Sequence, residues 1–137
     1  MTRTSRSVAQ TESIAADLAR SLTGGECIAL EGPLGAGKTQ FVRGLATALG
    51  ADPRSVSSPT FVLLNIYRNG RLTLFHLDAY RVHGPEDFDA IGFPELLEQK
   101  GVVIVEWASR VEKILPENRI NVQIEVTGKS SRRITIE

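Results

Sequence analysis

Residues 32–39 read Gly32-Pro33-Leu34-Gly35-Ala36-Gly37-Lys38-Thr39, which matches the pattern G-x-x-x-x-G-K-[ST] of phosphate-binding loops. Such a loop joins the end of a strand to the first turn of a helix. The apolar run at 27–30 predicts a buried strand before it, and Phe41, Leu45 and Leu49 recur at helical spacing after it. The alternative, a glycine-rich connector with an incidental Lys-Thr pair, does not explain these flanking patterns.

The chemistry of a bound triphosphate explains the residue types of this loop. Gly35 and Gly37 allow the backbone to curl until successive N–H groups point at phosphate oxygens, and the following helix adds its free N-terminal N–H groups. Lys38 is expected to reach the β- and γ-phosphates, and Thr39 to offer its hydroxyl to Mg²⁺. The residues expected to bind the nucleotide here are Gly35, Ala36, Gly37, Lys38, Thr39 and Gln40.

Length and composition predict a single domain over residues 1–137. Sixteen basic residues balance sixteen acidic ones, so the overall charge gives no reason to expect nonspecific binding to nucleic acid or a membrane. Cys27 is the only cysteine and lies in an apolar run, which indicates a buried structural residue and a reducing, cytoplasmic setting. No apolar run approaches transmembrane length, and the Arg/Ser-rich residues 1–7 are expected to form a frayed terminus.

The remaining patterns predict an α/β fold with a mixed central sheet and helices on both faces. Asn69-Gly70 between two β-forming segments is a strong hairpin signal, so an antiparallel pair should join the parallel strands. Ser7 with Gln10, and Ser109 with Glu112, have the spacing of capping boxes. We expect helices at 8–22, 38–49 and 109–115, helical turns from 84 and 94, and strands at 26–31, 61–67, 71–77, 102–105, 120–126 and 133–136.

Two carboxylates follow predicted strands and are candidates to hold Mg²⁺ or to orient an attacking water. Asp78 follows the strand at 71–77, and Glu106 follows the continuous β-branched run at 102–105. The second strand is the more uniformly apolar, which favours Glu106 for the metal and Asp78 for a catalytic role. The alternative for either carboxylate is that it only caps the end of its strand in contact with solvent and has no role in a site. Trp107, the only tryptophan, follows Glu106 and is expected to leave the strand on the face opposite that carboxylate. Core packing is its default interpretation, and packing under the site or contact with a partner are the alternatives.

Residues 56–61 are polar and interrupted by proline, so they predict a loop. Many nucleotide-dependent switches carry a segment that senses the γ-phosphate at this position in the sequence, which makes Ser58, Pro59 and Thr60 candidates for such a role. A plain connector is an equally good interpretation from spacing alone. Tyr80 and Arg81, which follow Asp78, are further candidates for a switch or a partner contact.

Five motifs in this order resemble the TsaE family, the small ATPase of bacterial tRNA threonylcarbamoyladenosine biosynthesis. They are Ser7-x-x-Gln10-Thr11, the phosphate loop, Ser58-Pro59-Thr60-Phe61, His76-x-Asp78-x-Tyr80-Arg81 and Val105-Glu106-Trp107. The resemblance implies Thr11 beside the adenine, Thr39 with Glu106 at Mg²⁺, and Asp78 as a catalytic or water-positioning carboxylate. It also implies that Arg132 or Arg133 approaches the nucleotide.

The resemblance further implies an accessory subunit whose ATP hydrolysis supports repeated turnover of a transferase pair, TsaB and TsaD, with tRNA contacted only indirectly. The main alternative is a P-loop kinase for a small metabolite, for which the only candidate lid is the acidic segment at 84–95. A GTP-dependent switch would carry an Asn-Lys-x-Asp motif, and the sequence has none. A pure binding module with a structural nucleotide is the remaining alternative.

Overall fold

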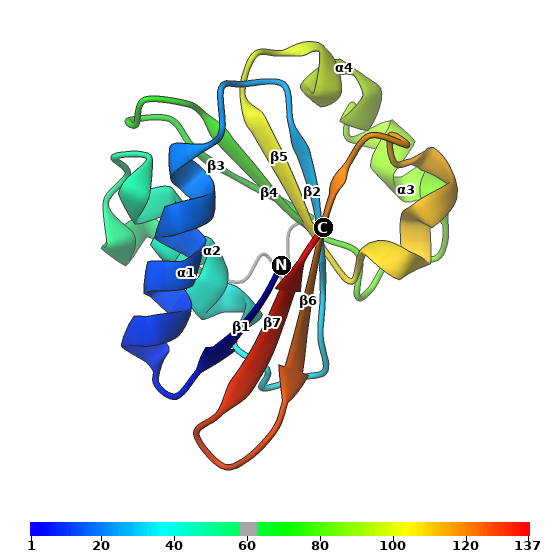
Figure 1. Cartoon of the computed structure of the whole chain (residues 1–137). Helices are drawn as coiled ribbons and strands as arrows, with labels where there is room; N and C mark the ends of the chain where they lie inside the picture. Colours follow the sequence, from blue (N-terminus) through cyan, green and yellow to red (C-terminus); the bar gives the residue numbers. More distant parts are fainter. Residues whose placement is uncertain (58–62) are drawn as a thin grey trace.

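The computed structural model describes residues 1–57 and 63–137, which form one seven-stranded mixed sheet flanked by helices (Figure 1). This is the predicted fold class. Across the sheet the strands are β1 (Thr2–Ser5), β7 (Arg132–Ile136), β6 (Ile120–Val126), β2 (Cys27–Glu31), β5 (Val102–Glu106), β4 (Leu74–Asp78) and β3 (Leu64–Tyr67).

Four neighbouring strands, β6, β2, β5 and β4, run parallel, and antiparallel strands complete the sheet on each side. The β3–β4 pair confirms the hairpin predicted around Asn69-Gly70, and β6 pairs antiparallel with β7 to form a closing hairpin at the end of the chain. Because β2, β5 and β4 are parallel neighbours, their carboxyl ends meet at one edge of the sheet. Open α/β sheets bind ligands at that edge.

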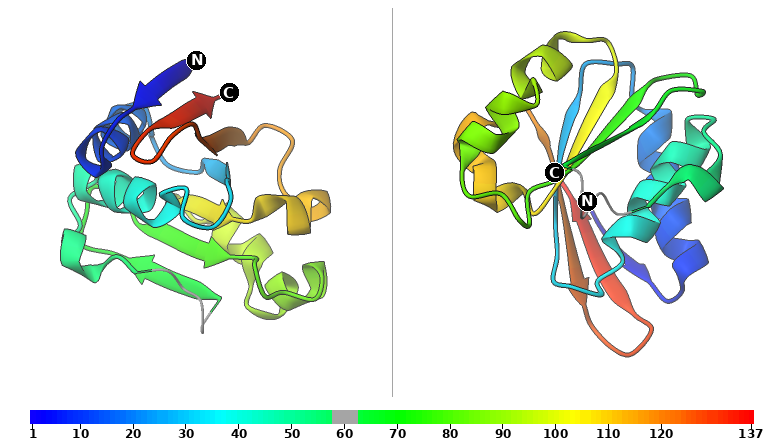
Figure 2. Two further views of the ribbon diagram at one scale, coloured as in Figure 1. Left: turned by 90° about the horizontal axis from the view of Figure 1, so that it is seen from below. Right: turned by 180° about the vertical axis from the view of Figure 1, so that it is seen from behind.

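The helices cover both faces of the sheet, as Figures 1 and 2 show. One face carries α1 (Val8–Arg20) and α2 (Lys38–Ala48), and the other carries α3 (Pro85–Ala90), α4 (Phe93–Glu98) and the 3₁₀ segment η2 (Ala108–Ile114). A further 3₁₀ turn, η1 (Pro53–Ser55), follows α2. Each face has its own hydrophobic cluster, with Phe41 fully buried in the first and Phe88 in the second.

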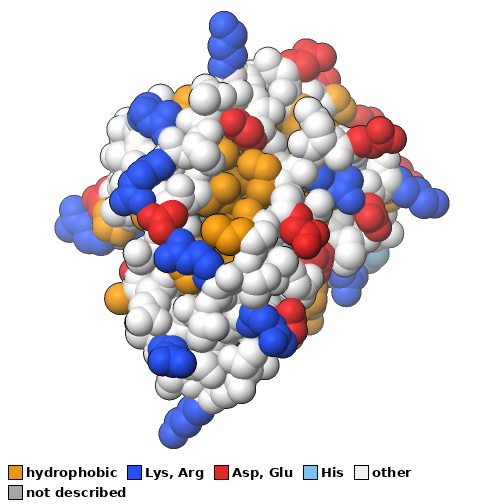
Figure 3. Space-filling model, viewed as in Figure 1, with side chains coloured by type: hydrophobic (Ala, Val, Ile, Leu, Met, Phe, Trp, Pro, Cys, Tyr) orange, Lys and Arg blue, Asp and Glu red, His pale blue; other side chains and the backbone are white. Residues whose placement is uncertain are grey.

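Alternation along the strands divides side chains between the two clusters. Ile28 and Leu30 of β2 join the first cluster, whereas Cys27 and Ala29 join the second. Burial raises the pKa of the Cys27 thiol to about 12, as expected for a structural cysteine and not for a nucleophile. On the face drawn in Figure 3, basic and acidic side chains are interspersed around a central hydrophobic area. Within the described ranges no helix is long and apolar enough to cross a bilayer.

The start of α1 confirms one of the two hydrogen bonds of the first capping box. The Ser7 side chain accepts the Gln10 N–H at 3.1 Å. The Gln10 side chain accepts the N–H of Arg6, at 2.6 Å, and not that of Ser7 as a capping box would have it. The helix ends at Arg20, two residues before the predicted end.

The expectation of a frayed N-terminus was wrong. Residues 2–5 form β1, which pairs antiparallel with β7 from Thr2↔Thr135 to Ser5↔Arg132. The closing hairpin leaves the outer edge of β7 with unpaired backbone groups, and β1 satisfies them. The Ser5 side chain is fully buried, and Arg3 forms an ion pair with Asp17 of α1 at 2.5 Å, so this strand is also tied to the first helix.

The second predicted capping box, Ser109 with Glu112, was also wrong. The cap position is taken by Trp107, whose backbone is left-handed with φ of 56°, and the segment is a 3₁₀ helix with a kink at Val111. The Ser109 N–H donates to Oε1 of Glu31 at 2.5 Å, so a tertiary partner replaces the local cap.

Replacing Gly44 by alanine is expected to destabilise the fold, although the same change in an exposed helix stabilises by about 1 kcal/mol. A Cβ at Gly44 would lie 2.4 Å from the carbonyl oxygen and 2.5 Å from the Cα of Glu12, which belongs to the backbone of α1. Separating the two helices costs roughly 1–3 kcal/mol. Urea denaturation should show this loss, whereas Thr47→Ala, an exposed change on the same helix, should leave the midpoint nearly unchanged. An unchanged or higher midpoint for Gly44→Ala would contradict the predicted close packing.

Candidate functional site

The loop between β2 and α2 has the curled backbone that its sequence predicts. Gly35 and Gly37 adopt φ of 78° and 103°, a region that other residues enter only with strain. The Ala36 N–H donates to the Pro33 carbonyl at 3.1 Å, which closes a tight turn. Gly37 occupies the cap position, so α2 begins at Lys38 with its free N–H groups directed into the loop.

Lys38 lies at the base of the loop and is only 7% exposed. Its ammonium donates to the Gly32 carbonyl and lies 3.5 Å from the ring centroid of Trp107. Burial lowers the pKa of Lys38, and the nearby carboxylates of Glu106, Glu31 and Asp78 act in the opposite direction. The ammonium is therefore held beside acidic groups in a partly dry setting, where its interaction with an anion is strong.

Asp78 and Glu106 lie side by side at the ends of β4 and β5, where they are register partners. They are 5% and 3% exposed. Burial raises the pKa of Asp78, the neighbouring Glu106 raises it further, and the Tyr80 N–H bonded to Oδ1 at 2.8 Å partly offsets this. Two buried carboxylates next to one ammonium form a site at which a divalent cation would relieve repulsion.

Glu106 also has a buried partner to which the sequence analysis assigned no role. Its Oε2 accepts a hydrogen bond from Nε2 of His76 at 2.5 Å, and Nδ1 of the same ring lies 3.1 Å from the Tyr67 hydroxyl. Alternation along β4 does place His76 on the same face as Asp78, so the sequence could have indicated that His76 lies near the site. No sequence pattern indicates the contact across strands from His76 to Glu106.

The two arginines of β7 have different positions. The Arg132 guanidinium donates to the carbonyls of Ala36 at 2.9 Å and Gly35 at 3.1 Å, so it holds the phosphate loop from outside. The Ala36 carbonyl and the Gly37 N–H belong to one trans peptide and point in opposite directions. Because Arg132 binds this carbonyl, the Gly37 N–H points away from Arg132. Arg133 points to the opposite face and forms an ion pair with Glu125 at 3.0 Å, so the structure does not bring it to the loop as expected.

A pocket of about 360 Å³ lies between this loop and the start of α1. Thr11 lines it and is held by a hydrogen bond of 2.7 Å between its hydroxyl and that of Ser5. The structure thus brings Thr11 and Gln40 to the same pocket as the loop. The other residues of its lining are Arg6, Ser7, Val8, Gly35, Ala36, Gly37, Lys129, Ser130 and Arg132.

The aromatic residues after β4 and β5 meet beside Lys38. The rings of Tyr80 and Trp107 are 5.0 Å apart between centroids, and the Arg110 guanidinium lies 5.4 Å from the Tyr80 ring. Trp107 packs against the second cluster, on the face predicted for it, and its ring also reaches Lys38. Arg81 is exposed next to Tyr80, and Ser58, Pro59 and Thr60 lie outside the described residues.

The donor set fits a magnesium ion shared with phosphate oxygens. Within residues 1–57 and 63–137, no group of three or more His, Cys, Asp or Glu side chains forms a cage for a metal. Mg²⁺ does not require such a cage, because it is commonly held by one or two carboxylates together with phosphates and waters. The carboxylates of Glu106 and Asp78 and the hydroxyl of Thr39, in the first turn of α2, are oxygen ligands of this kind.

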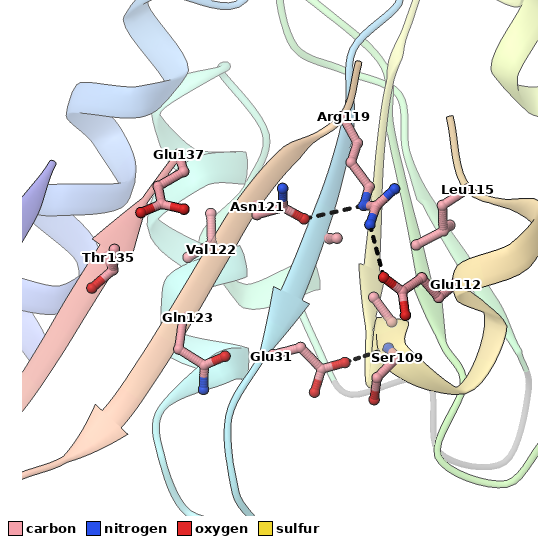
Figure 4. Close-up of a pocket in the computed structure, with 12 residues that line it drawn as sticks. Glu31, Ser109, Glu112, Leu115, Arg119, Asn121, Val122, Gln123, Thr135 and Glu137 are labelled. Atoms are coloured by element: carbon pink, nitrogen blue, oxygen red, sulfur yellow. Dashed lines mark hydrogen bonds and ion pairs between the residues drawn. The ribbon is translucent and has the colours of Figure 1, made fainter. Parts of the chain in front are cut away.

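A smaller pocket of about 160 Å³ lies between η2 and strands β2, β6 and β7 (Figure 4). Some of its polar groups are engaged with one another. Arg119 donates to Oδ1 of Asn121 at 3.1 Å and to Oε1 of Glu112 at 3.2 Å, and Glu31 accepts the Ser109 N–H. The pocket of about 360 Å³ is lined by the glycines of the phosphate loop, which makes it the candidate ligand site.

A glycine-rich loop between a central parallel strand and a helix, with carboxylates at the ends of the next two strands, defines the fold of the P-loop NTPases. Residues 5–134 match the family model described as "Threonylcarbamoyl adenosine biosynthesis protein TsaE". The chain therefore belongs to the TsaE family, which acts in the biosynthesis of threonylcarbamoyladenosine in tRNA.

The sequence is similar to those of individual relatives over most of their length. The chain is 42% identical to a tRNA threonylcarbamoyladenosine biosynthesis protein TsaE from Treponema pallidum, with 96% of each chain covered. It is 40% identical to the protein of that name from Bacillus subtilis, over 92% of this chain and 78% of the relative. The crystal structure of B. subtilis YdiB superposes with a TM-score of 0.82 at 33% identity, covering 99% of this chain and 83% of the other.

Proposed function

We propose that this protein binds and hydrolyses ATP with Mg²⁺, and that it is an accessory subunit for a TsaB and TsaD transferase pair in threonylcarbamoyladenosine formation. Hydrolysis is expected to be weak for the isolated protein and to increase with these partners, and tRNA is contacted only through the complex. The observation that best supports this proposal is the Lys38 ammonium at the base of a curled loop, beside the buried carboxylates of Asp78 and Glu106.

Each residue of the site has a role in this proposal. The N–H groups of Gly35 and of residues 37–40, with the Lys38 ammonium, would bind phosphate oxygens, and Thr11 and Gln40 would line the adenine end of the pocket. Thr39 and Glu106 would hold Mg²⁺, which supplies charge neutralisation at the phosphates. Asp78, whose pKa is raised by burial, would orient the attacking water or accept its proton.

Arg132 acts on the loop in this proposal, and Arg133, paired with Glu125, is not among the nucleotide-binding residues. By donating to the carbonyls of Gly35 and Ala36, Arg132 fixes the loop in the conformation that presents its N–H groups. Tyr80, Arg81 and Trp107 are proposed to contact partner subunits, because the tilted rings of Tyr80 and Trp107 pack together at the rim of the site and Arg81 is exposed beside them.

The alternative of a small-molecule kinase finds less support. Its only candidate lid, the segment at 84–95, contains α3 and the start of α4. Phe88 and Phe93 of this segment are 0% and 1% exposed, with ring centroids 5.3 Å apart, so both helices are anchored in the second cluster. A lid that closes over a substrate needs weak attachment to the rest of the fold.

The proposal is tested by measuring phosphate release from ATP with and without the purified TsaB–TsaD pair. We expect roughly a 10-fold or larger increase with the pair, since a partner that completes a P-loop site can contribute far more than that. A rate unaffected by the pair would contradict the accessory role. Label transferred to an added metabolite, instead of appearing as free phosphate, would favour the kinase.

A further inference from the structure

His76 is fully buried in the middle of β4, and both of its ring nitrogens have polar partners. Its exposed fraction is 0%, and the neighbouring side chains of Phe75 and Leu77 are also buried. Nε2 bonds to Oε2 of Glu106 at 2.5 Å, and Nδ1 lies 3.1 Å from the Tyr67 hydroxyl. A carboxylate only accepts hydrogen bonds, so the proton of the first bond comes from His76.

The pairing of the strands explains how these side chains meet. His76 is opposite Ile104 in β5, and Asp78 is opposite Glu106, so both residues of β4 point to the face that α2 covers. The Glu106 side chain reaches diagonally toward His76 and uses one oxygen, Oε2, for this contact. Its other oxygen, Oε1, is the one that a metal ion would take.

The contacts continue beyond His76 to the backbone of Ser57. The Tyr67 hydroxyl donates to the Ser57 carbonyl at 3.3 Å, and Nδ2 of Asn65 donates to the same carbonyl at 3.1 Å. Tyr67 and Asn65 are on β3, the edge strand that pairs with β4. Polar contacts thus run from Ser57 through Tyr67 and His76 to the carboxylate at the end of β5, and the single proton of the Tyr67 hydroxyl serves either Ser57 or Nδ1 of His76.

We propose that His76 is a positioning residue that fixes the orientation of Glu106 and links it through Tyr67 to the backbone of Ser57. Polar partners of this type orient a metal-ligating carboxylate, and their loss typically costs ~10- to 100-fold in metal affinity. An arginine or lysine at this position would bring a permanent positive charge into competition with the metal. The metal-related part of this inference rests on the proposed function, whereas the link from His76 to Glu106 does not.

The link itself is tested by NMR without any nucleotide. A ring N–H proton of His76 should exchange slowly with solvent and resonate downfield, because it is buried in a short bond to a carboxylate. The signal should shift in Tyr67→Phe, disappear in Glu106→Ala and persist in His83→Gln, which alters the exposed second histidine. A protein without this signal would overturn the inference.

The effect on the metal is tested by titrating Mg²⁺ in the presence of a non-hydrolysable ATP analogue, with Trp107 fluorescence as the readout. In His76→Leu, Mg²⁺ affinity should fall ~10- to 100-fold, while binding of the analogue in EDTA should change by less than about twofold. His76→Gln, which keeps an N–H donor, should recover much of the loss. Tyr67→Phe should give a smaller loss and serves as a second variant if His76→Leu is poorly folded.

Two results would overturn this role for His76. One is unchanged Mg²⁺ affinity in folded His76→Leu, and the other is an equal loss of analogue binding with and without Mg²⁺, which would indicate general disruption. If the unsubstituted protein binds no analogue in either condition, the proposed function is overturned, and the metal-related part of this inference with it. The NMR signal would still decide whether His76 holds Glu106.

Discussion

Lys38→Ala is expected to lower ATP turnover by roughly 10²-fold or more, because removing one charged donor aimed at a reacting group typically has an effect of this size. ATP affinity should also fall, since the ammonium lies at the base of the loop where the β- and γ-phosphates would be. Calorimetry with ATP and a phosphate-release assay would measure the two losses separately.

The fold should tolerate this substitution. Alanine removes the hydrogen bond to the Gly32 carbonyl, but it also removes an ammonium that burial disfavours, so the net change in stability should be within about 1 kcal/mol. Lys113→Ala, at an exposed position in η2, is the matched control and should bind ATP normally. Unchanged ATP affinity in Lys38→Ala would rule out the loop as the phosphate site.

Glu106→Ala and Asp78→Ala are expected to separate metal binding from turnover. Glu106→Ala should weaken Mg²⁺-dependent nucleotide binding by roughly 10-fold or more, as expected for loss of a metal carboxylate. Asp78→Ala should leave that binding closer to normal and lower turnover by roughly 10²- to 10⁴-fold, the usual contribution of a general base. Magnesium titrations and single-turnover rates on the same samples provide the comparison.

Glu117→Ala changes an exposed carboxylate outside the site and controls for the loss of negative charge. The opposite pattern, with Mg²⁺ affinity lost mainly in Asp78→Ala, would exchange the two roles. The structure allows either assignment, since the two carboxylates are register partners with similar burial. Glu106 differs because its Oε2 is already oriented by His76.

The sequence predicted the features that depend on local patterns. The phosphate loop, the strand before it and the helix after it follow from residue types at fixed spacing, and the Asn69-Gly70 hairpin follows from turn chemistry. Asp78 and Glu106 were predicted to follow strands, and they are the last residues of β4 and β5, but the pairing of these two strands was not predicted.

Features that depend on contacts distant in sequence could not be predicted in this way. To predict that β1 pairs with β7, one must already know that the β6–β7 hairpin has an edge without a partner strand. The left-handed backbone of Trp107 and the contact from Ser109 to Glu31 overrode a good local capping pattern. Only the register of β7 separates Arg132, which reaches the loop, from Arg133, which faces the other way.

The position of β1 and β7 beside the phosphate loop has a consequence for how fast their amide hydrogens exchange with solvent. The pocket is closed by residues 6–11, directly after β1, and by residues 129–132, directly before and within β7. A molecule bound there would fasten the first and last strands to the middle of the polypeptide at a single point. Amide hydrogens in β1 and β7 should then exchange more slowly in its presence, together and to a similar degree.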